Sequence, residues 1–195
     1  MISIYQLKTA FQNLLRPLNQ WLANLGVTPN QVTLLALALS IATGVVISIY
    51  HANSNILWLV PVILFVRMAL NAIDGMLARE HHMQSALGAL LNELGDILSD
   101  CALYLPFALL TIIDAPWIVA IVLLAVISEA VGIMGVQIGA SRRYDGPMGK
   151  SDRAFFFGLL AILIALGLIN SVWTTWYLAV ILSLIHISEP TRQDR

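Results

Sequence analysis

Acidic side chains stand inside two long segments that are otherwise apolar. Asp74 lies in the first segment, and Glu93, Asp96 and Asp100 lie in the second. A charged group inside a membrane costs a few kcal/mol or more, so these carboxylates must face one another, a water-filled cavity or bound ions. Opposed carboxylates with nearby carbonyl oxygens suit a hard divalent cation, Mg2+ or Mn2+.

The spacing puts these side chains on shared helix faces. Two sets recur at intervals of three or four residues: Asn71, Asp74 and Ala78 in the first segment, and Asn92, Asp96 and Asp100 in the second. Such intervals stack side chains on one face of a helix. Because only a short link near residues 80–83 joins the segments, we expect antiparallel helices on which Asp74 and Asp96 face each other.

Basic residues indicate what such an ion would bind. A hard divalent ion held by carboxylates commonly contacts the phosphates of a substrate. Arg79 follows Asp74 closely, and a second basic group comes later in the chain: Arg142, Arg143, Lys150 and Arg153. Cations of this kind bind phosphate oxygens. The residues therefore predict phosphoryl chemistry.

The composition predicts the setting of this chemistry. Of 195 residues, 59% are hydrophobic and only 11% are charged, whereas soluble domains carry about 25% charged residues. This deficit predicts an all-α integral membrane protein. The net charge of -1 gives no indication of nucleic-acid binding, and a single cysteine, Cys101, excludes an intrachain disulfide.

The hydrophobic pattern predicts one domain of six transmembrane helices. The expected spans are residues 29–50, 56–80, 84–113, 117–140, 150–169 and 172–187, within a domain of residues 27–187. Residues 1–26 mix apolar and polar side chains at helical spacing, which favours an amphipathic helix in the membrane interface. Residues 188–195 form a polar tail that we expect to be disordered or foreign to the natural protein.

The basic residues predict the orientation. Nine of the ten Lys and Arg residues fall on one side of the six expected spans, and only Arg67 lies deep in a span. Cytoplasmic loops carry such an excess of Lys and Arg. We therefore expect a multi-pass protein of the cell (inner) membrane, with both termini and the active site in the cytoplasm.

The acidic cluster carries a familiar signature. The run Asp74-Gly75-x-x-Ala78-Arg79, followed after eight residues by Gly88-x3-Asn92-x3-Asp96, resembles the D-x2-D-G-x2-A-R-x8-G-x3-D-x3-D signature of the CDP-alcohol phosphatidyltransferase family. Every spacing is kept. Thr28-Pro29-Asn30-x-x-Thr33 is similar to the stretch before the family's first span. The resemblance covers residues 1–187.

The resemblance implies an activity and a set of partners. Family members transfer a phosphoryl-linked group from a CDP-alcohol, most commonly CDP-diacylglycerol, to the hydroxyl of an acceptor alcohol, and they release CMP. They act in phospholipid biosynthesis among membrane lipids and are often homodimers. The basic group at residues 142–153 favours an acceptor that carries phosphate, such as glycerol phosphate or inositol phosphate. Diacylglycerol with a CDP-amino alcohol donor is an open alternative.

The resemblance also implies residue roles. The motif acids form a two-metal site in which Asp74 binds metal and Asp96 is the general base. The cytidine and diphosphate are held by Asn30, Thr33, Gly75, Ala78, Arg79 and Gly88. The acceptor or its phosphate is assigned to Arg142, Arg143, Lys150 and Arg153.

Two positions depart from the signature, because Asn71 and Asn92 stand where the family has acids. An amide oxygen can ligate Mg2+ but brings no negative charge. Three outcomes are open. Glu93 and Asp100 supply the missing carboxylates; the site holds one metal, or two weakly; or catalysis is lost and binding of lipid or nucleotide is kept.

The buried charges have other interpretations as well. Intramembrane acids serve as proton or cation relays in transporters, or as structural ion pairs, here with Arg67 and Arg79. Arg67 lies two turns before Asp74 and suits charge balance as well as substrate contact. Glu129, in the fourth expected span, favours a polar tie between helices over catalysis.

Overall fold

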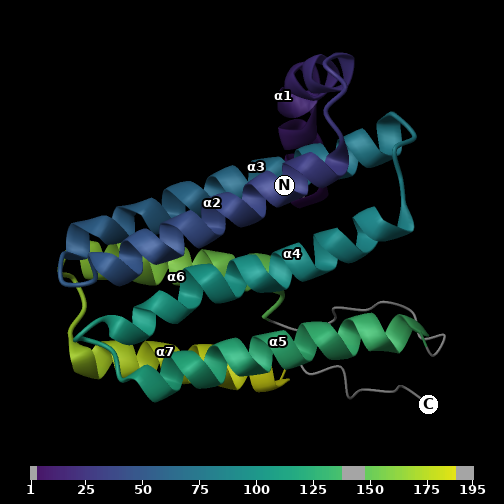
Figure 1. Cartoon of the computed structure of the whole chain (residues 1–195). Coiled ribbons are helices and arrows are strands. Elements are labelled where there is room, and N and C mark those ends of the chain that lie inside the picture. Colours follow the sequence, from purple (N-terminus) through teal and green to yellow (C-terminus); the bar gives the residue numbers. More distant parts are fainter. Residues whose placement is uncertain (1–3, 138–147, 188–195) are drawn as a thin grey trace. The chain divides into compact units, whose positions relative to one another are not determined.

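The computed structural model describes residues 4–137 and 148–187, and throughout these ranges the regular structure is helical. The helices in chain order are α1 (Ile4–Asn24), α2 (Pro29–Ile49), η1 (Ser54–Trp58), α3 (Leu59–Glu80), α4 (Ala86–Tyr104), η2 (Leu105–Leu109), α5 (Ala115–Gln137), α6 (Lys150–Ala165) and α7 (Ser171–Ile187), where η marks a 3-10 helix (Figure 1). The all-α prediction is confirmed.

The break between α1 and α2 is encoded locally. Gly26 has a φ of 76°, and the amide of Val27 donates to the carbonyl of Leu22 at 3.0 Å, which closes α1 as a glycine C-cap. Thr28 and Gln31 then bond reciprocally: the Gln31 amide donates to Thr28 Oγ1, and the Thr28 amide donates to Gln31 Oε1. This capping box starts α2.

The third expected span, residues 84–113, is not one continuous α-helix. The helix α4 ends at Tyr104, and the 3-10 helix η2 follows. Pro106 is the cause, because a proline disfavours helical geometry at the residue before it and removes a backbone donor.

Three helical stretches in the described part of the chain are long and apolar enough to cross a membrane: Pro29–Ile49, Ser54–Glu80 and Ala115–Gly135. The helix Ser171–Ile187 is apolar but shorter. Three acids interrupt α4, and α6 has only 16 residues and begins with charged groups. Six spans therefore remain a prediction. Large apolar side chains such as Phe65, Leu98 and Trp176 are exposed, as in a protein surrounded by lipid.

The contacts divide the chain into two compact units. The first unit comprises Met1–Ser40 and Ile63–Ser99, and the second comprises Ile41–Val62 and Asp100–Arg195. The first unit thus holds α1, the start of α2, most of α3 and most of α4. The second holds η1, η2, α5, α6 and α7. The domain division into residues 1–26, 27–187 and 188–195 follows from the sequence pattern and stays a prediction.

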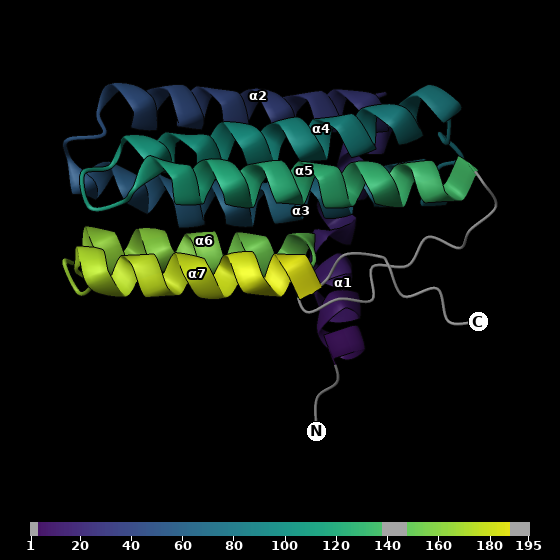
Figure 2. The ribbon, with the colours of Figure 1, turned by 90° about the horizontal axis from the view of Figure 1, so that it is seen from below.

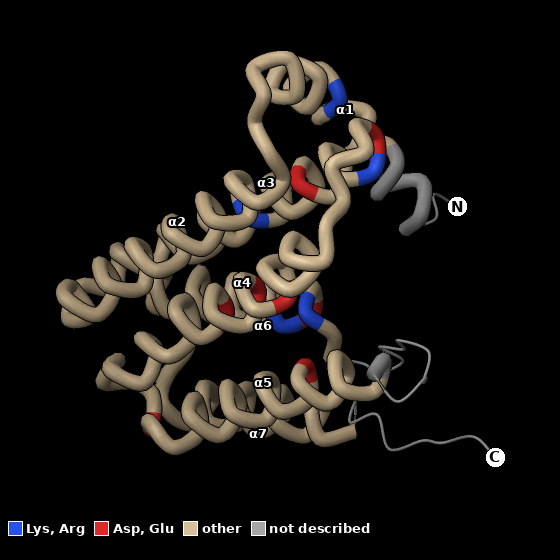
Figure 3. The backbone as a smooth tube through the Cα atoms, turned by 45° about the vertical axis from the view of Figure 1, so that its right-hand side comes forward, with Lys and Arg blue, Asp and Glu red and all other residues tan. Residues whose placement is uncertain are grey.

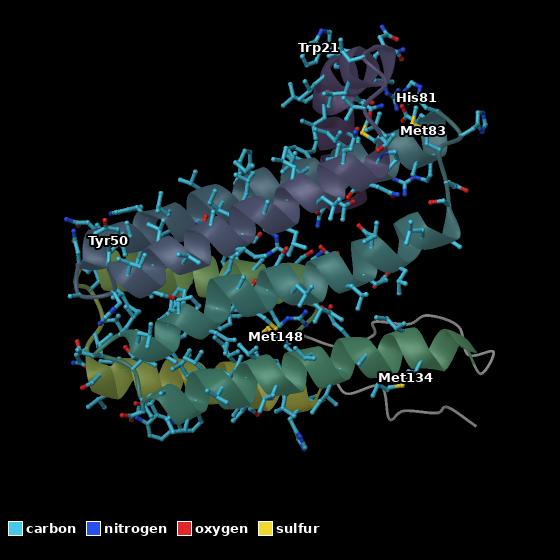
Figure 4. The ribbon with its side chains drawn as sticks, in the orientation of Figure 1. Trp21, Tyr50, His81, Met83, Met134 and Met148 are labelled. Carbon is cyan, nitrogen blue, oxygen red and sulfur yellow. The ribbon has the colours of Figure 1, made fainter. Side chains whose placement is uncertain are left out.

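In the first unit, α1 is fixed against the end of α3. Arg16 pairs with Glu80 at 3.0 Å, and Asn19 Nδ2 lies 3.4 Å from the His81 ring nitrogen Nε2. Figure 3 shows the oppositely charged positions of the two helices side by side, and Figure 4 shows His81 beside α1. The first unit also has an apolar core of Val32, Ile73 and Leu77, packed with Leu15, Leu22, Ala23, Val27 and Leu70.

In the second unit, aromatic rings join η2 to α6. Tyr104 stacks on Phe157 with ring centroids 3.9 Å apart, and Phe107 meets Phe157 edge to face. Figure 2 shows α6 and α7 running side by side, and the Tyr177 hydroxyl of α7 donates to the Phe156 carbonyl at 2.8 Å. Helix α5 packs on α7 and η2. These contacts bury the apolar faces of helices that are short of charged residues.

Candidate active site

Asp74 is a buried carboxylate of α3 that a threonine of α2 holds. Thr33 Oγ1 donates to Asp74 Oδ2 at 2.8 Å. The carbonyl oxygen of Pro29 lies 3.1 Å from the same hydroxyl. A hydroxyl has a single proton, and a hydrogen bond to a charged carboxylate is the stronger of the two. Thr33 therefore orients Asp74.

Asp96, on α4, receives two groups from α3. The Asn71 amide Nδ2 donates to Asp96 Oδ1 at 3.0 Å. The Arg67 guanidinium Nη2 lies 3.7 Å from the same oxygen, and the Arg67 side chain is 5% exposed. A buried guanidinium this close to a carboxylate offsets the cost of holding both charges away from water. Asp96 is thus fixed from one side by a cation and an amide.

The two carboxylates are connected through α3 and α2. Asn71, which binds Asp96, lies three residues before Asp74 and on the same helix face. Thr33, which binds Asp74, also approaches α4, because a Cβ added to Gly95 would lie 3.2 Å from Thr33 Cγ2. The structure therefore brings together these four predicted site residues within the first unit.

Among the residues predicted to bind the nucleotide, two glycines each lie in close contact with a polar side chain of the same set. A Cβ on Gly88 would lie 2.8 Å from Asn30 Oδ1, so with a larger residue there the Asn30 side chain would have to shift. A Cβ on Gly75 would lie 3.1 Å from Arg79 Nη2, so the arginine side chain lies over the bare glycine backbone one turn before it. Arg79 is exposed, and Ala78 is half-buried beside it.

The remaining predicted metal ligands separate into two groups. Asn92 and Glu93 are half-buried on α4 within the first unit. Asp100 belongs to the second unit and pairs with Arg153 of α6 at 3.5 Å. The structure thus gives Asp100 a different partner from the motif acids.

Arg153 is the centre of a buried ion cluster rather than an exposed cation. Its Nη2 atom pairs with Glu129 of α5 as well as with Asp100, and all three side chains are at most 10% exposed. Its Nη1 atom donates to the Met148 carbonyl at 3.4 Å. This cluster fits the expectation that Glu129 is a polar tie between helices. Lys150 is half-buried at the start of α6, and Arg142 and Arg143 lie outside the described residues.

Sequence reasoning missed the specific pairs at this site. Thr33 and Asp74 are 41 residues apart, Asn71 and Asp96 are 25 apart, and Arg153 and Glu129 are 24 apart. No local periodicity links residues at such separations. A useful signal was available in the cost of burial, since a buried arginine such as Arg67 needs a carboxylate partner.

The donor atoms can be compared with what a divalent ion needs. In the part of the chain that the structure describes, no group of three or more His, Cys, Asp or Glu side chains is arranged to hold a metal. Asn71 contacts Asp96 through its amide nitrogen, and Asn92 lies one helical turn before Asp96. Hard cations accept carboxylate, amide and water oxygens together. The described carboxylates therefore do not make a metal site by themselves, and an ion here would need amide, water or substrate oxygens as further ligands.

Comparisons with known proteins agree with this chemistry. The model of the CDP-alcohol phosphatidyltransferase family matches residues 26–185. The inner membrane protein YnbA of Escherichia coli K12 is 46% identical over 175 residues, which cover 90% of this chain and 85% of that protein.

Solved structures share the fold. The chain resembles Mycobacterium tuberculosis phosphatidylinositol phosphate synthase PgsA1 with CDP-DAG bound, with a TM-score of 0.59 and 20% identity over 92% of this chain and 96% of that chain. PgsA1 in complex with manganese and citrate gives the same TM-score and identity over 92% and 91% of the two chains. The described helices thus have the fold of a CDP-alcohol phosphotransferase.

The signature spacing, the site around Asp74 and Asp96 and the family match over residues 26–185 lead to one assignment. The apolar helices and the inner membrane relative place the protein in a membrane. This chain belongs to the CDP-alcohol phosphatidyltransferase family and is a membrane-bound transferase of substituted phosphate groups in phospholipid synthesis.

Proposed function

We propose that the protein transfers a phosphatidyl group from CDP-diacylglycerol to the hydroxyl of an acceptor alcohol and releases CMP. The observation that carries this proposal is the pair of Asp74 and Asp96, each held by a side chain of a neighbouring helix within one compact unit. Two carboxylates among apolar helices cost folding free energy, and such residues inside a membrane usually mark a functional site. The bound CDP-DAG in PgsA1 supports the choice of donor.

Asp96 is the proposed general base. Its Oδ1 atom accepts from Asn71 and faces Arg67, so the carboxylate is held in one orientation. A general base must be positioned within hydrogen-bond reach of the proton that it removes. In this proposal Asp96 takes the proton of the acceptor hydroxyl. The acceptor oxygen then forms a bond to the phosphorus of the phosphatidyl group, and the bond from that phosphorus to CMP breaks.

Mg2+ or Mn2+ is the proposed cofactor. Asp74 and Asp96 would hold it together with the oxygens of Asn71, Asn92 and Glu93, and the manganese in a PgsA1 structure supports this. When bound, such an ion neutralises charge on the diphosphate oxygens. We leave Asp100 out of this set, because its carboxylate is paired with Arg153.

The donor's cytidine and diphosphate are assigned to one surface of the first unit. Arg79, exposed at the end of α3, supplies the positive charge for the diphosphate. Gly75 lies against the Arg79 side chain and Gly88 against that of Asn30, and Ala78 is a small, half-buried residue of the same helix as Gly75. Thr33 completes this set through its contact with Asp74.

The basic residues favour an acceptor that carries phosphate. Lys150 and the arginines at 142 and 143 suit a phosphate anion, whereas Arg153 is engaged by Glu129 and Asp100. The same basic residues favour a cytoplasmic active site with both termini on that side, by the positive-inside rule. A homodimer, surrounded by lipid, is part of the same proposal.

A CMP-release assay tests the function. The purified protein in lipid nanodiscs is given CDP-diacylglycerol and, in turn, glycerol phosphate, inositol phosphate and uncharged alcohols, with Mg2+, Mn2+ or a chelator present. We expect CMP release that needs a divalent ion and is fastest with a phosphorylated acceptor. If no CMP is released from CDP-diacylglycerol with any of these acceptors and metal ions, the proposal is refuted.

A further inference from the structure

The last turn of α3 carries Arg79 and ends in a strained cap. The Met83 amide donates to the Ala78 carbonyl at 3.1 Å, and this bond encloses residues 79–82. His82, at the position after the helix where glycine is usual, has a φ of 55°. A left-handed backbone costs free energy at a residue with a side chain, and it persists where the surrounding structure holds it. The end of α3 therefore needs support from outside the helix.

Helix α1 supplies this support at Glu80 and His81. Arg16 pairs with Glu80 at 3.0 Å, and Asn19 Nδ2 lies 3.4 Å from His81 Nε2. Figure 4 shows His81 and Met83 close to α1. The pair with Glu80 is exposed, and such pairs contribute little stability. Asn19 is 1% exposed, so its contact with His81 is shielded from water and is the stronger of the two.

The side chain of Asn19 is a poor choice for packing alone. Asn19 lies four residues after Leu15 and three before Leu22, both of which pack on the apolar core of the first unit. Its Oδ1 atom is buried and has no hydrogen-bond partner among the described residues. A buried polar atom without a partner is destabilising, and such an exception needs an explanation. The amide at position 19 therefore indicates a role other than stability.

The Arg79 side chain lies along its own helix. A Cβ on Gly75 would lie 3.1 Å from Arg79 Nη2 and 3.3 Å from Nη1. A long arginine side chain loses conformational freedom when it binds an anion, and a side chain that is already held in position loses less. A fixed last turn of α3 therefore strengthens the binding of an anion by Arg79.

We propose that Asn19 and His81 are positioning residues for Arg79: their contact fixes the last turn of α3 and so sets the affinity for the diphosphate of the donor. This inference rests on the proposed function in taking Arg79 as the ligand of the diphosphate. In this role neither residue touches the reacting atoms. Loss of the contact therefore weakens donor binding, which raises KM, and leaves kcat nearly unchanged.

Asn19→Leu tests this role, because leucine fills the space of the amide and removes the buried polar atom. We expect its thermal midpoint to be unchanged or higher. We expect KM for CDP-diacylglycerol to rise about threefold to tenfold, with kcat changed by less than about twofold. The Kd for CDP, which carries the diphosphate without the lipid, should rise by the same factor. It is measured by isothermal titration calorimetry on the full chain in nanodiscs with Mg2+.

Substitutions of His81 show whether the two residues act through one contact. His81→Leu should raise the Kd for CDP as Asn19→Leu does, and the double variant should raise it no further. His81→Gln, whose amide can still bond Asn19, should keep the natural Kd. Asn13→Leu makes the same substitution at an exposed position of α1 and is the matched control. Effects that multiply in the double variant would overturn the inference.

CMP release and CDP binding together separate the possible failures. If the natural protein releases CMP and both leucine variants bind CDP as tightly as it does, the inference is wrong and the proposed function stands. If no CMP is released but both leucine variants bind CDP more weakly, the function fails and the inference stands. If the natural protein neither releases CMP nor binds CDP, both fail. A lower thermal midpoint with a matching fall in kcat in Asn19→Leu would show a purely structural role.

Discussion

Thr33 on α2 donates a 2.8 Å hydrogen bond to Asp74 on α3, across 41 residues of sequence. The hydroxyl also lies within 3.1 Å of the Pro29 carbonyl, and the Thr33 methyl carbon meets α4 at Gly95. One small side chain therefore contacts all three helices that carry the site. This explains why a β-branched residue with a hydroxyl, rather than valine or serine, suits the position.

Thr33→Val keeps the shape of the side chain but removes the hydrogen bond to Asp74. Groups that orient metal ligands typically contribute 10–100-fold to metal affinity or activity. We expect CMP release to fall by roughly that factor and the Mn2+ concentration for half-maximal activity to rise. Thr33→Ser keeps the hydroxyl and should retain most of the activity. An unchanged metal dependence in Thr33→Val would contradict this role.

Asp96→Asn removes the proposed base while keeping the size of the side chain. General-base catalysis contributes about 10²–10⁴-fold, so we expect CMP release to fall by at least a hundredfold. The thermal midpoint of the detergent-solubilised protein should also fall, because Arg67 loses the carboxylate that it faces, so CMP release is compared at a temperature where both proteins are folded. Asp114→Asn, at an exposed position before α5, is the control. Near-normal turnover in Asp96→Asn would assign the base elsewhere.

Gly88→Ala tests the close approach of α4 to α2. The added Cβ would lie 2.8 Å from Asn30 Oδ1 and 2.9 Å from Ser85 Oγ. Overpacking costs typically about 1–3 kcal/mol, and because both near atoms are side-chain ends that can turn away, we expect a cost at the lower end of that range. We expect a lower thermal midpoint and weaker binding of the CDP-alcohol, seen as a raised KM. Ala89→Ser adds one heavy atom at the exposed neighbouring position and should be neutral. Equal behaviour of the two variants would show that the gap is not needed.

Glu129→Ala breaks the buried cluster around Arg153 in the second unit. It removes one of two carboxylates that face the guanidinium, the other being Asp100. A buried charge left with no partner costs about 3–5 kcal/mol, and because Arg153 keeps Asp100 we expect a smaller cost than that. We expect a marked fall in the midpoint of chemical denaturation. Glu80→Ala breaks the exposed pair with Arg16 and should cost at most about 1 kcal/mol.

The triple variant Asp100→Leu, Glu129→Leu, Arg153→Met, which replaces the whole buried cluster, distinguishes a structural cluster from a functional one. Replacing a whole buried ion pair with apolar groups is often neutral or stabilising. If the cluster only joins α5 to α6, we expect stability to recover relative to Glu129→Ala, with CMP release kept. Recovery of stability with loss of CMP release would show instead that Arg153 contacts a substrate.

The sequence by itself determined the membrane setting, the helical fold and the family. These follow from composition, from apolar runs and from the spacing of Asp74, Gly88 and Asp96, all of which are local properties of the chain. The start of α2 could also be predicted from the sequence, at Thr28 and Pro29. The end of α4 at Tyr104 could likewise have been predicted, because Pro106 follows it closely in the sequence.

Only the tertiary structure decided which buried charge faces which. Arg67 was equally suited to balancing charge and to binding substrate until its contact with Asp96 was seen, and Asp100 resembled a site acid until it was found with Arg153. The physical reason is that helical periodicity gives the face of a side chain but not the helix that meets it. Pairing of buried charges depends on the packing of helices distant in sequence, and that packing is fixed by small residues such as Gly88 and Gly95.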